Sequence, residues 1–285
     1  MPPLVSLQAR DLSLLQGLFE CRVMTLAHIA SIYFEDRREA AKKRVQKLKA
    51  AGFIGERPRR AYDPCILFLT RKALLLLHNE GFTSKYPPLS RNALERRAHV
   101  SDLTIRHELE VLSVKAAFHK ALRGKRHLSI AEFGTWPLLY EFSAEHPTKR
   151  ESTLVRPDGF IRIHEKEKDG VSEHTFFLEV DRSTETLETL VAKAASYVSF
   201  YRSGGFAVRN GGDRDAFRDF PFRVLVVCKS KERRDNLARA LLSRNPPILT
   251  QVMATTLTEV LANPLAKTWM QPNALASNSG AVALL

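Results

Sequence analysis

The chain has 285 residues and a formal net charge of +13, and hydrophobic residues make up 44% of it. This length suggests about two domains, and the apolar fraction is sufficient for a buried core. The excess of positive charge favours a polyanionic partner, either nucleic acid or an anionic membrane surface. No apolar run approaches the roughly 20 residues that span a bilayer, and the first residues lack the basic start and apolar core of a signal peptide.

Three cysteines are set far apart among apolar neighbours, at Cys21, Cys65 and Cys228. Their number is odd and their spacing matches no metal site, so we expect free thiols in a reducing compartment. These observations predict a cytoplasmic protein with no membrane partner.

Residues 1–82 predict a small domain of helices with one hairpin. Apolar periodicity predicts helices over 7–20, over 25–34 and from about 36 to 51, with Thr25 as the N-cap of the second. Two short strands, 53–57 and 66–69, flank a basic loop, and Thr70 begins a further helix. This order is typical of a winged helix-turn-helix, in which the third helix enters the major groove of DNA.

The segment Arg37–Arg60 concentrates positive charge on the third helix and the hairpin loop, with ten Lys or Arg residues against two acidic ones. The spacing of Ala41, Val45 and Leu48 predicts one buried helix face, so the opposite face is basic. We therefore predict that the chain binds double-stranded DNA. The predicted DNA contacts are Arg38, Lys42, Lys43, Arg44, Gln46, Lys47, Arg57, Arg59 and Arg60. A solvated helix face and a protein-binding surface are the alternatives.

A polar stretch around Pro87 and Pro88 predicts a linker over 83–98. Residues 99–265 predict a second domain with the order α-β-β-β-α-β-α-β. Its predicted elements span 101–122, 128–133, 154–163, 175–180, 184–201, 222–228, 231–243 and 248–254. The nearly continuous apolar run over 222–228 is typical of a strand that is covered on both faces. Residues 134–151 and 203–221 are expected to be irregular, and residues 266–285 to be a disordered tail.

Three acidic residues belong to two predicted strands, one within the first strand and two at the end of the second. Asp158 follows a kink at Pro157, and Glu179 and Asp181 share one face of the next strand because side chains alternate. If the strands are neighbours, three carboxylates converge and need a cation to offset their repulsion. Mg²⁺ or Mn²⁺ is the expected cofactor, since hard divalent ions take oxygen ligands. Turn and helix-cap roles for Asp158 and Asp181 are the alternative.

The order of these motifs resembles the core of the PD-(D/E)XK nuclease superfamily. The resemblance rests on RPDG at 156–159, FFLEVD at 176–181, a helix with Lys193 and Tyr197, and the apolar strand that follows. With the predicted winged helix and the HEL at 107–109, the chain over about 7–260 resembles the plasmid replication-relaxation family. The resemblance implies a DNA-binding protein of a plasmid, phage or integrative element that acts in replication initiation, nicking or mobilisation.

The expected fold class is therefore α+β: a winged helix-turn-helix followed by a restriction-endonuclease-like α/β domain with a central mixed sheet. The superfamily motif ends in a lysine where this sequence has Asp181. Two residues could take its role: Arg182, which points to the other face if the strand continues, and Lys193 on the following helix, for which a solvated surface lysine is the alternative. The resemblance implies that Asp158, Glu179, Asp181 and Lys193 form the catalytic site of a Mg-dependent endonuclease or nickase. In that site, Asp158, Glu179 and Asp181 would be the metal ligands.

The missing motif lysine leaves a second interpretation open, because the resemblance implies that this lysine orients the attacking water. The chain would then be a non-catalytic replication or transcription regulator that binds DNA and uses the nuclease fold as a platform. Further candidate partners are a second copy of the chain and replication or transfer proteins.

Overall fold

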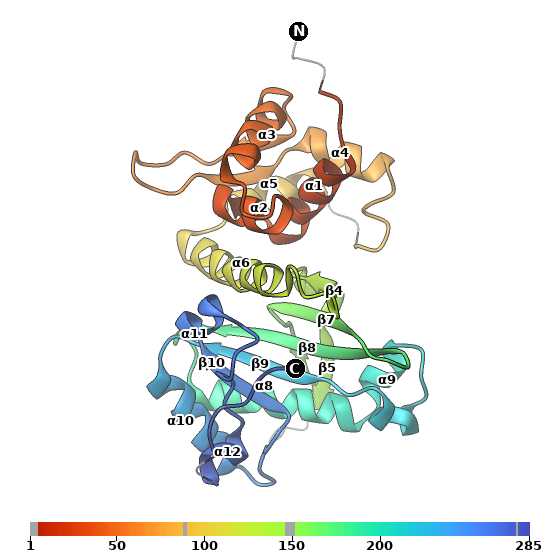
Figure 1. Cartoon of the computed structure of the whole chain (residues 1–285), viewed down its shortest axis with the longest axis vertical. Helices are drawn as coiled ribbons and strands as arrows, with labels where there is room; N and C mark the ends of the chain where they lie inside the picture. The colour runs from red at the N-terminus through yellow and green to blue at the C-terminus, as the bar shows by residue number, and fades with distance from the viewer. Residues whose placement is uncertain (1–4, 88–89, 146–151, 278) are drawn as a thin grey trace. The chain divides into compact units, whose positions relative to one another are not determined.

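The computed structural model describes residues 5–87, 90–145, 152–277 and 279–285. The fold is mixed α+β with a central mixed sheet, and the chain separates into two compact units, Met1–Lys120 and Ala121–Leu285 (Figure 1). The sequence predicted a second domain from residue 99, whereas most of the long helix α6 belongs to the first unit. The reason is local contact: Ser113 of α6 hydrogen-bonds His28 at 3.1 Å, and Glu108 pairs with Arg22 at 3.5 Å.

The first unit combines helices with a three-stranded antiparallel sheet of order β1-β3-β2. Its helices are α1 Ala9–Cys21, α2 Leu26–Tyr33, α3 Arg38–Ala50, α4 Arg71–Asn79, α5 Arg91–Ala98 and α6 Asp102–Leu122. Its strands are β1 Val23–Thr25, β2 Ile54–Glu56 and β3 Ile66–Leu69. As predicted, Thr25 caps α2 and Thr70 caps α4, each accepting a backbone N–H three residues on. The sequence did not predict β1, which is too short to show an alternating pattern.

The predicted linker contains the helix α5, which begins at a cap in which Ser90 accepts the N–H of Ala93 at 3.2 Å. Residues 88 and 89 of the linker lie outside the described residues.

The second unit is built on a five-stranded sheet of order β10-β9-β8-β7-β4. β9 is parallel to β8 and to β10, whereas β7 is antiparallel to β8 and to β4, so the sheet is mixed as expected. The strands are β4 Leu128–Gly134, β7 Gly159–Lys166, β8 Val171–Asp181, β9 Arg223–Cys228 and β10 Val252–Thr256, and a separate pair is formed by β5 Phe142–Glu145 and β6 Ser152–Val155. The helices are α7 Pro137–Tyr140, α8 Leu187–Arg202, α9 Gly205–Arg209, the 3₁₀ helix η1 Arg214–Asp219, α10 Lys231–Leu242, α11 Leu257–Ala262 and α12 Pro272–Ala276.

Three segments of the second unit differ from the sequence-based expectation. Residues 154–163 are not one interrupted strand: the chain leaves β6 before Pro157 and enters the central sheet as β7. Proline has no backbone N–H to donate to a sheet, which favours such a break. Residues 134–151 and 203–221 were expected to be irregular, but the first stretch contains α7 and β5 and the second contains α9 and η1.

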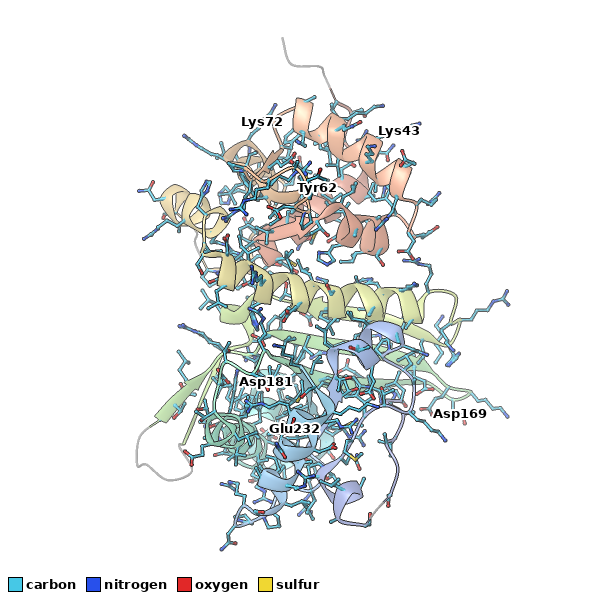
Figure 2. The ribbon with its side chains drawn as sticks, turned by 90° about the vertical axis from the view of Figure 1, so that its left-hand side faces the viewer. Lys43, Tyr62, Lys72, Asp169, Asp181 and Glu232 are labelled. Atoms are coloured by element: carbon cyan, nitrogen blue, oxygen red, sulfur yellow. The ribbon has the colours of Figure 1, made fainter. Side chains whose placement is uncertain are left out.

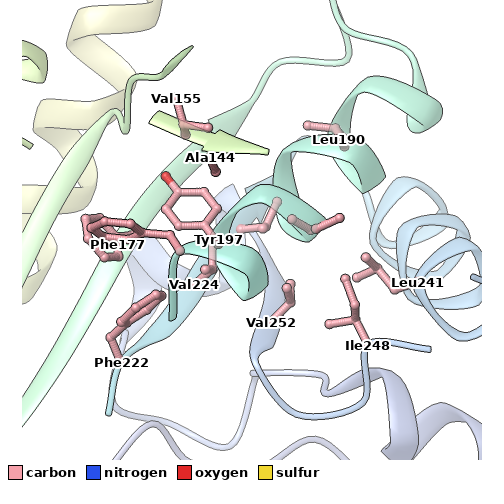
Figure 3. Packing of buried hydrophobic residues seen from close by; sticks show 14 of the residues in the cluster. Ala144, Val155, Phe177, Leu190, Tyr197, Phe222, Val224, Leu241, Ile248 and Val252 are labelled. Atoms are coloured by element: carbon pink, nitrogen blue, oxygen red, sulfur yellow. The ribbon is translucent and has the colours of Figure 1, made fainter. Parts of the chain in front are cut away.

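The core lies between α8 and the central sheet, and it positions the charged residues described below. Residues 175–181 of β8 are all buried, so the end of this strand is covered on both faces. Tyr197 of α8 is fully buried and packs at 5.2 Å between ring centroids on Phe177 of β8, near Phe222 (Figure 3). A polar side chain that points from β8 toward α8 therefore lies inside an apolar cluster.

The described part of 266–285 is packed rather than disordered, contrary to the expectation. Trp269 is fully buried, its indole N–H donates to the carbonyl of Pro264 at 2.8 Å, and Leu284 is 2% exposed. Met270 forms a β-bridge with Ala254 of β10. A few buried side chains are enough to hold such a segment, although its composition is typical of disorder. None of the described helices has the length and apolar character needed to span a membrane.

Candidate functional site

The helix α3 separates an apolar face from a basic one, as the sequence predicted. Ala41, Val45 and Leu48 are at most 5% exposed. The residues on the other side are exposed: Arg38, Lys42, Lys43, Gln46 and Lys47. Cations in the last turn also interact favourably with the carbonyl end of a helix. The helix is therefore packed against the core on one side and presents exposed cations on the other.

Arg44 departs from the predicted set of DNA contacts because it is committed to Asp11 of α1. Its Nε donates to Oδ1 of Asp11 at 2.8 Å, and a terminal nitrogen donates to Oδ2 of the same side chain. That nitrogen also reaches the carbonyl of Ser6 at 2.7 Å. Asp11 is completely buried, and Arg44 is only 16% exposed. Arg44 therefore links α3 to α1 and stabilises the fold of the first unit.

The loop between β2 and β3 contains the other predicted contacts, and they are not equivalent. Arg57 is 18% exposed, donates to the carbonyl of Val100 at 3.1 Å and lies 3.7 Å from Asp102. Arg59 donates from Nε to Glu56 at 3.0 Å, although it is partly exposed. Arg60 is exposed. Among the described residues, the side chain of Arg60 forms no ion pair with a carboxylate, unlike those of Arg57 and Arg59.

In the second unit, Asp158, Glu179 and Lys193 lie together. Glu179 of β8 is 5% exposed. Its Oε2 accepts Nζ of Lys193 at 2.5 Å, and its Oε1 accepts the hydroxyl of Tyr197. Oδ2 of Asp158 accepts the N–H of Val180 at 2.7 Å, which places this carboxylate beside Glu179. Strand alternation and the i, i+4 spacing on α8 thus bring two acids, a lysine and a tyrosine to one point.

The surroundings shift the proton affinities of this cluster. Burial raises the pKa of the Glu179 carboxyl to about 7; the charge of Lys193 opposes this shift and that of Asp158 adds to it. Burial alone would lower the pKa of Lys193, but the carboxylates of Glu179 and Asp158 outweigh it and raise that pKa above its usual value. Burial, followed by the charge of Glu179, raises the pKa of Tyr197 well above its usual value. At neutral pH, Lys193 and Tyr197 are therefore donors, and Glu179 exchanges its proton near neutrality.

Asp181 does not join this cluster, although it lies on the same face of β8. Nε of Arg233 in α10 donates to its Oδ2 at 2.7 Å, and the N–H of Ser183 donates to its Oδ1 at 2.8 Å. The alternative role expected for Asp181, the cap of the following helix, is not seen either, because Thr186 caps α8. The predicted convergence of three carboxylates is thus absent, and the described residues contain no group of three or more His, Cys, Asp or Glu side chains that could hold a metal ion.

An open hollow of about 950 Å³ lies beside Lys193. Residues of β6, of α8 and of neighbouring turns line it. Its other charged side chains are two cations, Arg156 and Arg244, and two acids, Glu185 and Glu188. Lys193 is 23% exposed, whereas Glu179 and Tyr197 are buried behind it. Lys193 is therefore the member of the cluster that a ligand in the hollow would meet first.

Sequence reasoning missed two residues that decide how these sites work, Asp11 and Arg233. Each neutralises a predicted site residue from a distant part of the chain, 33 residues away for Asp11 with Arg44 and 52 for Arg233 with Asp181. Neither belongs to a motif, and no periodicity within one element reveals such a pair. Tyr197 carried a signal, since its spacing from Lys193 places the two on the same side of a helix.

Comparison with known proteins gives one family match over most of the chain. A family model described as "Replication-relaxation" matches residues 15–214. None of the curated proteins matches. Among solved structures, that of restriction endonuclease FokI is similar with 13% sequence identity and a TM-score of 0.30, over 96% of this chain and 44% of that one. The chain thus spans less than half the length of that structure.

Proposed function

Because the chain belongs to the replication-relaxation family, we propose that it is a DNA-binding protein that acts in plasmid replication or DNA relaxation. The exposed face of α3 carries this proposal. Within the described residues, its four cations Arg38, Lys42, Lys43 and Lys47 form no ion pair. Their charge is therefore available to phosphates, and release of counterions from DNA is the main source of affinity in such contacts.

In this proposal the first unit acts as a winged helix-turn-helix. The helices α2 and α3 form the helix-turn-helix, and the loop between β2 and β3 is the wing. Gln46 lies on the exposed face of α3, and its amide can pair with a base edge in the major groove. The neighbouring lysines and Arg60 would contact phosphates and set the position of the helix. Binding as a homodimer to a symmetric site belongs to the same proposal and would appear as two chains per duplex.

The test is binding of a mixed-sequence duplex, measured by fluorescence anisotropy over a range of salt concentrations. A Lys43→Ala/Lys47→Ala variant should bind more weakly and with a shallower salt dependence, since each phosphate contact contributes about 0.9 to the slope of log K against log salt. The charge-matched control is Lys166→Ala/Lys168→Ala, which changes the exposed last residue of β7 and an exposed residue of the turn that follows it. A parent protein that does not bind duplex at about 50 mM salt, or equal losses in both variants, would refute the proposal.

One observation favours a second function, cleavage of DNA by the second unit. Asp158, Glu179 and Lys193 lie together, and Lys193 also lines an open hollow. These residues fit a two-carboxylate site, in which Asp158 and Glu179 would hold Mg²⁺ or Mn²⁺, since Mg²⁺ often takes one or two carboxylates from a protein. Asp181 does not fit, because Arg233 neutralises it. When bound, such an ion activates water and offsets the negative charge that develops on a phosphate.

The residues of the chain contribute orientation and charge to this second function. Tyr197 fixes one oxygen of Glu179 from inside the core. Lys193 holds the other oxygen and would remain beside the hollow as a cation. The lysine that the nuclease motif lacks after Glu179 would in this way be supplied by α8.

Nicking of supercoiled plasmid in the presence of Mg²⁺ or Mn²⁺ tests the cleavage proposal. Asp158→Asn and Glu179→Gln should abolish nicking, whereas Asp169→Asn, an exposed acid in the turn between β7 and β8, should not (Figure 2). If the parent does not nick, or if Asp158→Asn nicks as well as the parent, the second function is refuted. The chain would then be a non-catalytic regulator with a nuclease-like platform.

A further inference from the structure

Tyr62 is the most exposed large apolar side chain among the described residues, at 101% against 62% for the next, Val171. It lies in the loop between β2 and β3, which projects from the body of the first unit in Figure 1; Tyr62 is labelled in Figure 2. A single exposed aromatic residue is ordinary on a protein surface. What distinguishes Tyr62 is the way in which the loop holds it and the charge that surrounds it.

The backbone under Tyr62 is a closed turn. The N–H of Asp63 donates to the carbonyl of Arg60 at 3.1 Å, and the carboxylate of Asp63 accepts the N–H of Arg60 at 3.2 Å. Arg59 braces the turn from below, with a bond to the carbonyl of Asp63 at 2.9 Å and another to Glu56 at 3.0 Å. The ring of Tyr62 is therefore presented at the tip of a loop whose backbone is already ordered, which lowers the entropy lost when it binds.

The charge around the ring selects the partner. Arg57, Arg59 and Arg60 precede Tyr62 in the same loop, and the exposed lysines of α3 belong to the same unit. A protein partner would have to be acidic to approach this loop, whereas duplex DNA offers phosphates for Arg60 and the lysines of α3, and apolar sugar and base edges for a ring. Proteins that bind duplex DNA combine cations for the phosphates with apolar side chains that contact the minor groove.

We propose that Tyr62 binds duplex DNA directly, with its ring packed on sugars and base edges of the minor groove while α3 occupies the adjacent major groove. This inference rests on the proposed function, because it requires that the first unit binds DNA. It adds a contact that carries no charge and therefore contributes affinity independent of salt concentration. The exposed cations contribute the salt-dependent part.

The test compares Tyr62→Ala, Tyr62→Phe and Lys43→Ala by fluorescence anisotropy with one mixed-sequence duplex at several salt concentrations. Tyr62→Ala should weaken binding roughly tenfold, as expected for loss of an aromatic contact with a nucleotide. Its slope of log K against log salt should equal that of the parent. Tyr62→Phe should bind like the parent. Lys43→Ala should instead reduce the slope by about 0.9. A minor-groove ligand such as netropsin should compete with the parent more strongly than with Tyr62→Ala.

Controls separate the possible failures. Val171→Ala removes an exposed apolar side chain from the second unit and should leave binding unchanged. Thermal melts should show that Tyr62→Ala folds like the parent, since a fully exposed ring makes little contribution to stability. If Tyr62→Ala binds like the parent while Lys43→Ala binds more weakly, the inference is refuted and DNA binding by α3 stands. If the parent itself does not bind duplex, the proposed function fails first.

Discussion

Arg44→Ala should destabilise the first unit, although the sequence places Arg44 among the DNA contacts. The guanidinium of Arg44 donates to Asp11 through Nε at 2.8 Å and to the carbonyl of Ser6 at 2.7 Å. Asp11 is fully buried and also accepts the N–H of Gln8 at 2.7 Å. Removing the guanidinium therefore leaves a buried carboxylate that has lost its counter-charge.

The size of the effect follows from this geometry. Removing one partner of a buried ion pair typically lowers the free energy of unfolding by about 3–5 kcal/mol. Arg44 is 16% exposed, so water can reach part of the site, and the bond from Gln8 to Asp11 persists. We therefore expect a loss near the lower end, about 3 kcal/mol. For a unit of this size, that corresponds to a melting temperature lower by roughly 10 °C.

Urea unfolding followed by circular dichroism measures the effect, and Lys43→Ala is the matched control. Lys43 is the preceding residue on α3 and is exposed, so its removal should change the free energy of unfolding by no more than about 0.5 kcal/mol. It should instead weaken DNA binding. The reasoning is refuted if Arg44→Ala is as stable as the parent and loses DNA affinity with the same salt dependence as Lys43→Ala.

Three further predictions concern the second unit. Burial raises the pKa of Glu179 from 4.5 to about 7, so the folded chain binds this proton more tightly than the unfolded chain. The free energy of unfolding should therefore fall as the pH rises from the lower of these values through the higher one. Urea titrations at about pH 5 and about pH 8 measure this fall, which should be smaller in Glu179→Gln. Lys193→Met should lower the free energy of unfolding by about 3 kcal/mol, because the buried Glu179 loses its counter-charge and keeps only the hydrogen bond from Tyr197. In a double-mutant cycle, the Lys193→Met/Glu179→Gln variant should recover most of this loss, and strictly additive losses would contradict the pairing. Trp269→Ala should lower the free energy of unfolding, measured with urea, by about 3–5 kcal/mol, because the indole is fully buried. An unchanged midpoint would mean that the C-terminal segment adds nothing to the stability of the fold.

Features that depend on one element or on neighbouring elements were predictable from the sequence. Helical spacing predicted the buried face of α3, formed by Ala41, Val45 and Leu48. The resemblance implied that Lys193 would serve the end of β8, and Lys193 does reach Glu179, which is only 14 residues away. In such cases the geometry of a single helix or strand determines the direction of a side chain, so the periodic pattern of the sequence predicts that direction.

Pairs between distant elements were not predictable in the same way. Asp181 has the strand position of a metal ligand, yet Arg233 reaches it from α10, and the choice between these roles depends on how the helix packs. Arg44 is similar, since its place in a basic run suggests a surface cation until α1 brings Asp11 against it. Charge counted along the sequence therefore overestimates the charge that a partner can meet.

This difference has a measurable consequence for DNA binding. Eight of the predicted contacts are Lys or Arg, and if all of them met phosphates, the slope of log K against log salt would be about −7. Arg44, Arg57 and Arg59 are already bonded to carboxylates or carbonyls within the unit. The cations that remain are Arg38, Lys42, Lys43, Lys47 and Arg60. They predict a slope of about −4.5 on a mixed-sequence duplex, with the same slope for Arg44→Ala under conditions where this variant is folded. A parent slope near −7 that becomes shallower in Arg44→Ala would mean that the internal ion pairs break when DNA binds. Arg44, Arg57 and Arg59 would then contact phosphates, and their assignment to the fold alone would be wrong.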